Sequence, residues 1–480
     1  MSLLILPLLI NCIAASAIDL PRIGDTSESF LSLEEEQKLG DEFMRNIRQS
    51  VDIIDDPEIK DYIQSLGHRL ATQGNVDGRK FTFFVVDNDE INAFAGPGGY
   101  IGIHSGLILT SKSESELASV IAHEIAHVTQ RHLARAFETA TRMQLPATAA
   151  IIAAIILGNR KGDLGEAALA ATVAGSVQNQ INFTRGNEKE ADRVGVELLA
   201  KSGFDPRAMP KFFERLHQAV HQIENQQLEF LQTHPVTTSR IADTSNRAEQ
   251  YPATEAPNDN LYHIIKARLK IMKNNSTDNL VRFENLLAEK KYENKTSAIY
   301  GYALSLLNKG HYKKARSQIN KLIRQSPENI TFQILLAKIE LAQNDFTSAL
   351  KIFTDSLSIY PNHHPLTMLY AKALIQNGEP ENARRILRDH LRNYEASPDI
   401  YNYLAQAETE MGNDIAAHQA LAEYYYLIGQ NPTAIQQLDF ALRIAKHSLS
   451  IKPELTETEQ QISKIEARLK QLHAESDSPH

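Results

Sequence analysis

The chain has 480 residues, a formal net charge of −9 and a single cysteine, Cys12. This length predicts two or three domains with an ample hydrophobic core. The excess of acidic residues argues against nucleic acid as the main partner, and one cysteine excludes a disulfide within the chain.

The N-terminal segment of the chain indicates export. An apolar stretch from Leu3 to Ala17, interrupted by Asn11, ends in an A-x-A cleavage pattern at Ala15–Ala17. It is too short to span a bilayer, so it predicts a signal peptide over residues 1–17. The absence of Lys or Arg before the apolar run departs from the usual pattern. Cleavage after Ala17 would remove Cys12, which also excludes thiol catalysis in the exported protein.

Two strands are predicted next, at Phe81–Val86 and at Tyr100–His104, the second after the turn Gly96–Gly99. Peptidases commonly hold an extended substrate by adding it to an exposed sheet edge. We therefore expect this region to bind unfolded polypeptide with loose side-chain preference. His104 is interpreted as a surface histidine rather than a ligand.

A helix with an unusual polar motif follows. Ser113 and Glu116 predict a capping box at its start. Residues 123–127 then spell H-E-x-x-H, and apolar residues at helical spacing precede the motif. His123 and His127, four residues apart, lie on one helix face and can reach the same metal ion. Glu124 lies beside that face, where it could take a proton from a metal-bound water. Histidines that merely hydrogen-bond are the alternative, but they would be costly to bury.

The third ligand is predicted much further along the chain. The positions where a metzincin would place its glycine and third histidine hold Gln130 and Leu133. Glu188 and Asp192 share a helical face, so Glu188 could ligate the ion while Asp192 accepts the outer N–H of a ligating histidine. Glu190 between them is expected to point elsewhere. A solvated acidic helix start is the alternative reading.

The segment between these motifs, residues 147–174, contains two apolar runs that are each too short to cross a membrane. Three interpretations of this segment stay open: a buried hairpin beside the active site, a mobile lid, or a segment that contacts the membrane surface.

H-E-x-x-H followed by E-x-x-x-D resembles the M48 family of zinc metallopeptidases. The segments Asn92–Ile101, Ser202–Pro206 and Thr233–Pro235 with Arg240 also resemble the family, over about residues 30–250. The resemblance implies a zincin-type endopeptidase with one Zn²⁺ per subunit. It implies these site residues: His123, His127 and Glu188 as zinc ligands, and Glu124, Asp192 and His234 as catalytic-site residues.

His234 has two expected roles. Neutral, it could ligate the fourth metal position and hold the enzyme latent; protonated and swung away, it could stabilise an oxyanion. Arg240 could anchor its loop to a carboxylate. A loop histidine packed beside Pro235 is the alternative.

The second half of the chain repeats with a period of 34 residues. Two ladders of small residues keep this spacing, at Ala303, Ala337, Ala371 and Ala405 and at Ala315, Ala349, Ala383 and Ala417. Gly310, Gly378 and Gly412 share one phase, with Asn344 in the remaining position. This period predicts tetratricopeptide repeats, capped by a further helix pair around Gly429 and Ala434.

The predicted fold class is α+β, mostly α: a zincin-type metallopeptidase domain with a small β-sheet, followed by an α-helical tetratricopeptide-repeat solenoid. The predicted divisions are a signal peptide (1–17), the peptidase (18–250), a linker (251–260), the repeats (261–445), and a C-terminal helix with a disordered tail from Ala474 (446–480). Lys and Arg gather between Lys266 and Arg324, which we interpret as a solvated helix face.

An M48 domain followed by such repeats resembles the BepA-like (YfgC-like) periplasmic proteases of Gram-negative bacteria. That resemblance implies a periplasmic endopeptidase that cleaves unfolded or misassembled envelope proteins, with roles in outer-membrane protein assembly and quality control. The repeats are then expected to dock on the assembly machinery in a chaperone-like manner. Peripheral membrane contact is open, and no nucleic acid is expected. The alternative is mainly a chaperone or adaptor with minor or latent proteolysis, although the complete ligand set favours retained chemistry.

Overall fold

The computed structural model is mostly α-helical with one three-stranded sheet, as predicted. It describes these residues: 31–74, 76, 78–142, 174–222, 229–252, 259–274, 276–451 and 456–477. The predicted signal peptide, Cys12 and residues 147–173 of the central apolar segment lie outside them. Within the described residues, no helix has the length and apolar character needed to cross a membrane.

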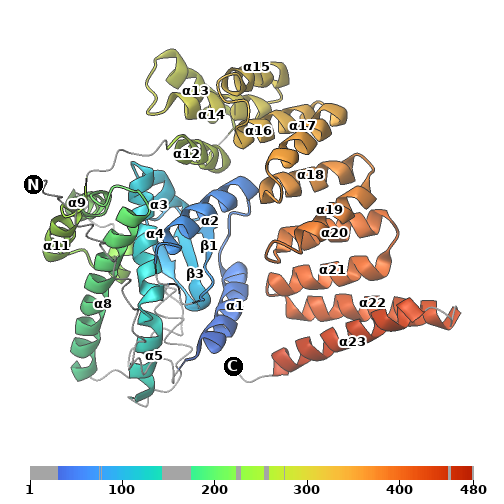
Figure 1. Cartoon of the computed structure of the whole chain (residues 1–480), viewed down its shortest axis with the longest axis horizontal. Helices are drawn as coiled ribbons and strands as arrows, with labels where there is room; N and C mark the ends of the chain where they lie inside the picture. Colours follow the sequence, from blue (N-terminus) through green and yellow to red (C-terminus); the bar gives the residue numbers. More distant parts are fainter. Residues whose placement is uncertain are drawn as a thin grey trace, which may run out of the picture.

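The first half of the chain contains the sheet and the helices around it (Figure 1). Its elements are α1 (Leu33–Ser50), α2 (Pro57–Ala71), β1 (Thr82–Val86), β2 (Ala93–Ala95), the 3₁₀ turn η2 (Pro97–Gly99), β3 (Tyr100–His104), α3 (Ser105–Thr110), α4 (Glu114–Thr129), α5 (His132–Arg142), α8 (Ala174–Lys201), α9 (Ala208–Gln222), α10 (Glu229–Thr233) and α11 (Thr238–Ala248).

The sheet has the order β1-β3-β2. β1 runs parallel to β3, and β2 pairs with the other side of β3 in the antiparallel direction. The turn that leads into β3 requires glycine at Gly99, whose φ is +75° and where a Cβ would collide with the carbonyl oxygen of Lys80. Because β2 lies at one end of the order β1-β3-β2, it is an edge strand.

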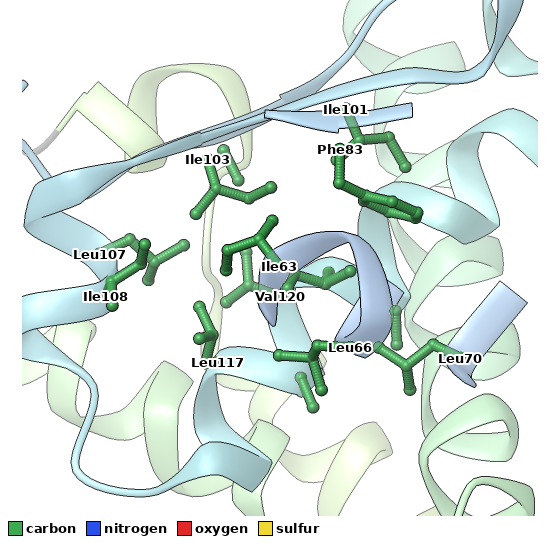
Figure 2. Packing of buried hydrophobic residues seen from close by; sticks show 14 of the residues in the cluster. Ile63, Leu66, Leu70, Phe83, Ile101, Ile103, Leu107, Ile108, Leu117 and Val120 are labelled. Carbon is green, nitrogen blue, oxygen red and sulfur yellow. The ribbon is translucent and has the colours of Figure 1, made fainter. Parts of the chain in front are cut away.

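The core of this half lies between the sheet and the helices α2, α3 and α4. Figure 2 shows side chains from β1 and β3 meeting those from the three helices. The labelled core residues are Ile63, Leu66, Leu70, Phe83, Ile101, Ile103, Leu107, Ile108, Leu117 and Val120. Packing on this apolar layer fixes α4, which carries the H-E-x-x-H motif, against the sheet.

The start of α4 differs in part from the prediction. The Ser113 hydroxyl accepts a hydrogen bond from the Glu116 amide, as expected. The Glu116 carboxylate does not return to the amide of Ser113. It accepts instead from the Lys112 amide at 2.7 Å and binds Arg215 on α9 through two bonds of 2.9 and 2.7 Å. A salt bridge to a distant helix replaces half of the local capping box.

His104 is buried, so its interpretation as a surface residue was wrong. β3 is the central strand of the sheet and has neighbours on both sides. The His104 ring also packs edge-on against Phe94 of β2, with ring centroids 6.2 Å apart. β3, which we expected near the edge of the sheet, is an inner strand because β2 folds back and pairs with it.

The second half is an array of helices that continues to the C-terminal part of the chain. Its elements are α12 (Asn260–Lys273), α13 (Ser276–Ala288), α14 (Lys295–Asn308), α15 (Tyr312–Ile323), α16 (Ile330–Ala342), α17 (Phe346–Ile359), α18 (His364–Gln376), α19 (Pro380–His390), α20 (Pro398–Glu410), α21 (Asp414–Leu427), α22 (Asn431–Ile451) and α23 (Thr456–Asp477).

The repeat phase is visible in the turns between paired helices. Gly310, Gly378 and Gly412 have φ of +76°, +76° and +73°, and Asn344 has +60°. Glycine and asparagine are the residues that tolerate this left-handed conformation best. The alanine ladders of the 34-residue period are buried, because small side chains let the helices approach closely.

The C-terminal boundaries differ from the prediction. α22 continues through the predicted boundary at residue 446, and α23 remains helical from Ala474 to Asp477. Leu472 is buried, and Arg468 of α23 binds Glu423 of α21 through two hydrogen bonds of 2.9 and 2.7 Å. These contacts hold the predicted C-terminal helix against the array, and only residues 474–477 contradict the predicted disorder.

The array contacts the first half at α2 and at α1, as Figure 1 shows for α12 and α18 beside α2. Arg268 of α12 is buried and binds Asp56 at the start of α2, at 2.8 and 2.6 Å. Arg45 of α1 donates to the Tyr426 hydroxyl at 3.1 Å. The interpretation of the basic run as a solvated face was therefore wrong for Arg268, whose charge is neutralised at the junction between the two halves. It was also wrong for Lys266, which is buried.

Candidate metal centre

The centre is built where α4 and α8 lie side by side (Figure 1). Gly195 on α8 permits the close approach: a Cβ there would lie 2.9 Å from the Met209 side chain and 3.3 Å from the backbone nitrogen of His123. One and two turns before Gly195, respectively, α8 presents Asp192 and Glu188 to the motif on α4. The two predicted motifs, separated by more than sixty residues in sequence, therefore meet because a glycine removes the side chain that would separate the helices.

Four side chains converge there: His123, His127, Glu188 and His234. Each offers one ligand atom, and these atoms all lie within 4.8 Å of one another. Nε2 of His123 lies 3.0 Å from Nε2 of His127 and 3.3 Å from Oε2 of Glu188. Nε2 of His127 lies 3.3 Å from Oε1 of Glu188. The three residues predicted as ligands are thus brought together.

His234 completes the group from the segment after α10. Its Nδ1 lies 3.3 Å from Nε2 of His123 and 3.1 Å from both carboxylate oxygens of Glu188. Its ring packs against Phe230, with centroids 4.9 Å apart. The structure places His234 inside the cluster rather than on a loop beside Pro235.

Asp192 and Arg240 support the first histidine from behind. Nδ1 of His123 lies 3.1 Å from Oδ1 of Asp192, a contact at hydrogen-bond distance that departs from a straight N–H···O angle. Arg240 donates to both oxygens of Asp192 at 2.7 Å, and its Nη1 lies 2.9 Å from Glu188 and donates to the Pro235 carbonyl at 2.9 Å. Arg240 therefore joins α8 to the segment that carries His234, as the sequence suggested for this arginine.

Glu124 is completely buried beside the cluster and belongs to none of these pairs. A backbone hydrogen bond from Ala95, on the edge strand β2, reaches its carboxylate. Its Oε1 has no hydrogen-bond partner among the described residues, and lies 3.5 Å from Nε2 of His234. Burial raises the pKa of Glu124 above its usual value, although His234 and His123 oppose that rise. The free oxygen can accept a proton.

Burial and neighbouring charges set the protonation of the ligand atoms. Burial lowers the pKa of His127 to about 3, so that its imidazole is neutral and can offer a lone pair. Burial opposes ionisation of Glu188, but His234 and His123 outweigh it and hold the pKa of that carboxyl well below the usual value. Burial also opposes protonation of His123, but contacts with Asp192 and Glu188 raise its pKa to about 10.

These residues fit a metal ion. Imidazole nitrogens and a carboxylate oxygen are ligands that first-row divalent ions prefer. The converging atoms are mainly acceptors at 3.0–3.3 Å from one another, too many for hydrogen bonding alone to satisfy. A cation at their centre would satisfy all of them.

One supporting group was missed by the sequence interpretation. His132 lies with its Nδ1 2.8 Å from Nδ1 of His127 and its Nε2 3.2 Å from Oε2 of Glu190. Glu190 does point away from the cluster, as expected, but toward His132. His132 follows His127 by five positions, a spacing that no helical pattern connects, so no sequence signal was available for this pair.

Comparison with known proteins agrees with the geometry. Residues 57–248 match the model of peptidase family M48, and residues 300–364 and 340–406 match tetratricopeptide-repeat models. The β-barrel assembly-enhancing protease of Escherichia coli strain K12 is 38% identical over 432 residues, which cover 89% of this chain and 88% of that protein. This chain belongs to peptidase family M48. It is a metalloendopeptidase that carries tetratricopeptide repeats.

Two further relatives match over a similar length. The β-barrel assembly-enhancing protease of Yersinia pestis is 36% identical over 436 residues, covering 90% of this chain and 89% of that protein. A putative protease of the same name in Vibrio cholerae is 38% identical over 426 residues, covering 87% and 88%. The M48 peptidase described here is thus similar to these proteins through both of its halves.

Proposed function

We propose that this M48 peptidase is a zinc-dependent endopeptidase of the bacterial periplasm that cleaves unfolded or misassembled envelope proteins during assembly of outer-membrane β-barrels. The observation that carries the proposal is the convergence of His123, His127 and Glu188 beside the unpartnered oxygen of Glu124. The similarity to proteins named β-barrel assembly-enhancing protease supports the proposed role in β-barrel assembly. The tetratricopeptide repeats of the same chain are proposed to dock on the assembly machinery in a chaperone-like manner.

The spacing of the donor atoms supports zinc as the metal. Nitrogen and oxygen ligands at about 2.0–2.1 Å from a tetrahedral zinc ion lie about 3.3–3.4 Å from one another. Nε2 of His123 lies 3.3 Å from both Glu188 and His234, and 3.0 Å from Nε2 of His127. These separations are close to the edges of such a tetrahedron. We propose one zinc ion per subunit, held by His123, His127 and Glu188.

Glu124 is proposed as the general base. A bound zinc ion would acidify a water molecule and polarise the substrate carbonyl. In this proposal the buried Oε1 of Glu124 would accept a proton from such a water and return it to the leaving amine. The backbone hydrogen bond from Ala95 holds the Glu124 carboxylate beside the edge strand β2. Asp192 is proposed to orient His123, while Arg240 orients Asp192.

The edge strand β2 is proposed as the substrate platform. Among the described residues β3 is the one strand that pairs with β2, and Ala95 of β2 donates a backbone hydrogen bond to the Glu124 carboxylate. An extended polypeptide added along β2 would run past the base, with its main chain held by ladder hydrogen bonds. This mode requires an unfolded segment and little side-chain selectivity.

His234 is proposed as a latency ligand. Its Nδ1 lies beside His123 and Glu188, where a fourth donor would exclude the water that attacks the substrate. Displacement of His234 would open that position. This placement also favours the second candidate function, an adaptor for β-barrel assembly whose proteolysis is suppressed until His234 moves.

The test compares cleavage of unfolded casein by the wild type, Glu124→Gln and His234→Ala at equal zinc content. Glu124→Gln should keep its zinc and lose about 10²–10⁴-fold in turnover, because proton transfer is removed. Glu197→Gln is the matched control: Glu197 lies on the exposed face of α8, paired with Lys201 at 2.7 Å, and its variant should cleave at the wild-type rate.

His234→Ala separates the two roles of that residue in the same assay. A marked rise in cleavage supports latency, and a fall of about 10²-fold supports oxyanion stabilisation. Unchanged cleavage would remove His234 from the mechanism. Full activity of Glu124→Gln would contradict the assignment of the base.

A further inference from the structure

The second histidine of the H-E-x-x-H motif has its own chain of polar partners. His132 is buried, and its ring meets that of His127 edge-on with centroids 4.8 Å apart. Its Nδ1 lies 2.8 Å from Nδ1 of His127, and its Nε2 lies 3.2 Å from Oε2 of Glu190. Nη1 of Arg135 donates to the same Glu190 oxygen at 3.1 Å. Both ring nitrogens of His132 are therefore paired.

The position of each proton in this chain follows from the direction of the first ring. Nε2 of His127 faces the cluster, 3.3 Å from Glu188, and must offer its lone pair to act as a ligand. Its proton then resides on Nδ1 and is donated to Nδ1 of His132. His132 must therefore carry its own proton on Nε2, which it donates to Glu190. Only this pair of tautomers satisfies all contacts.

A local break in the helix makes the contact possible. In one continuous helix, residues five apart point about 140° away from each other, so His132 could not reach His127. α4 instead ends at Thr129, and Arg131 adopts the left-handed conformation with φ of +55° before α5 begins. Such a conformation is unfavourable for a residue other than glycine. The Arg131 side chain is anchored to the Leu31 carbonyl at 2.6 Å, and Arg135 Nε donates to the Gln130 carbonyl at 2.9 Å.

We propose that His132 is a positioning residue for the metal centre, which fixes the tautomer and ring orientation of His127, and that Glu190 and Arg135 fix His132 in turn. This inference rests on the proposed role of His127 as a zinc ligand. α8 then serves three purposes with alternate residues: Glu188 is a ligand, Asp192 supports His123, and Glu190 supports His127 through His132. An arginine ends each supporting arm, Arg240 on one and Arg135 on the other.

The test measures zinc affinity, by competition with a chromophoric chelator, in His132→Phe, His132→Asn and Glu190→Ala. Loss of a group that orients a ligand typically weakens metal binding by about 10–100-fold, and we expect this loss for His132→Phe. His132→Asn should bind more tightly than His132→Phe, since its amide oxygen can still accept from Nδ1 of His127. Glu190→Ala should weaken binding less than His132→Phe, because His132 remains.

Glu197→Ala is the matched control on the same helix and should bind zinc like the wild type. The melting temperature of the metal-free protein provides the second readout. A role in packing alone would lower that temperature in every His132 variant and leave zinc affinity unchanged, which would overturn the proposal. If His132→Phe does not fold, wild-type affinity in Glu190→Ala would overturn it equally. A wild-type protein that binds no zinc would refute the proposed function itself, and with it the positioning role of His132.

Discussion

The metal centre and the repeat array are stabilised in opposite ways. In the centre, buried charged groups from α4, α8 and α11 are held by a few specific contacts between distant parts of the chain, such as Asp192 with Arg240. In the array, buried alanines and large apolar residues pack between helices that follow one another in sequence. The centre thus depends on single contacts that have no substitute, whereas the array spreads its stability over many similar ones.

The largest expected effect is at Arg240, in the centre. Arg240→Ala would leave the buried carboxylate of Asp192 without the cation that it pairs with. Removal of one partner from a buried ion pair typically costs about 3–5 kcal/mol, which urea denaturation of the zinc-loaded protein would measure. The matched change in the array is Lys351→Ala, which breaks an exposed pair with Asp355 of 3.0 Å and should cost less than about 1 kcal/mol. Similar losses in both variants would refute the contrast.

A smaller effect is expected at the junction, where Asp56 binds Arg268. Asp56→Asn keeps the helix cap, since asparagine caps as well as aspartate, and Arg268 retains Glu58 at 2.8 Å. We expect a loss of about 1.5–3 kcal/mol, the contribution of hydrogen bonds to a charged group.

The loss at Asp56 should depend on pH in a defined direction. Burial opposes ionisation of Asp56, but Arg268 outweighs it and lowers the pKa of this carboxyl. A depressed pKa contributes stability above the unfolded value of about 3.9, and that contribution disappears as the pH falls through the folded value. The difference between wild type and Asp56→Asn in urea denaturation should therefore be full at pH 6 and shrink below about pH 4. Asp389→Asn, which changes an exposed pair with Arg392 of 3.2 Å, is the matched control and should cost less than about 1 kcal/mol at pH 6.

The smallest effect is expected within the array, at Ala383. This alanine of the 34-residue ladder is completely buried, so Ala383→Leu should cost about 1–3 kcal/mol through overpacking. Zinc affinity should stay at the wild-type value, because the strain is confined to neighbouring helices. Arg385→Leu, at an exposed position of the same helix, should change the free energy of unfolding by less than about 0.5 kcal/mol. A loss of zinc affinity in Ala383→Leu would show that the array and the centre are coupled.

The sequence by itself determined the features that depend on spacing along one helix or on one repeat. His123 and His127 share a face because they are four residues apart, and so do Glu188 and Asp192. The 34-residue period predicted the turns at Gly310, Gly378 and Gly412 because each repeat makes the same local contacts.

Only the tertiary structure decided the contacts that depend on how distant elements meet. The pairing of His132 with His127 requires the left-handed Arg131, which no glycine or proline announces. The burial of His104 and of Arg268 follows from elements that fold back over them, β2 and α2. Such side chains look solvated in a sequence because local patterns report the neighbours along the chain. The free energy of burying a charge is set instead by the partner that arrives through space.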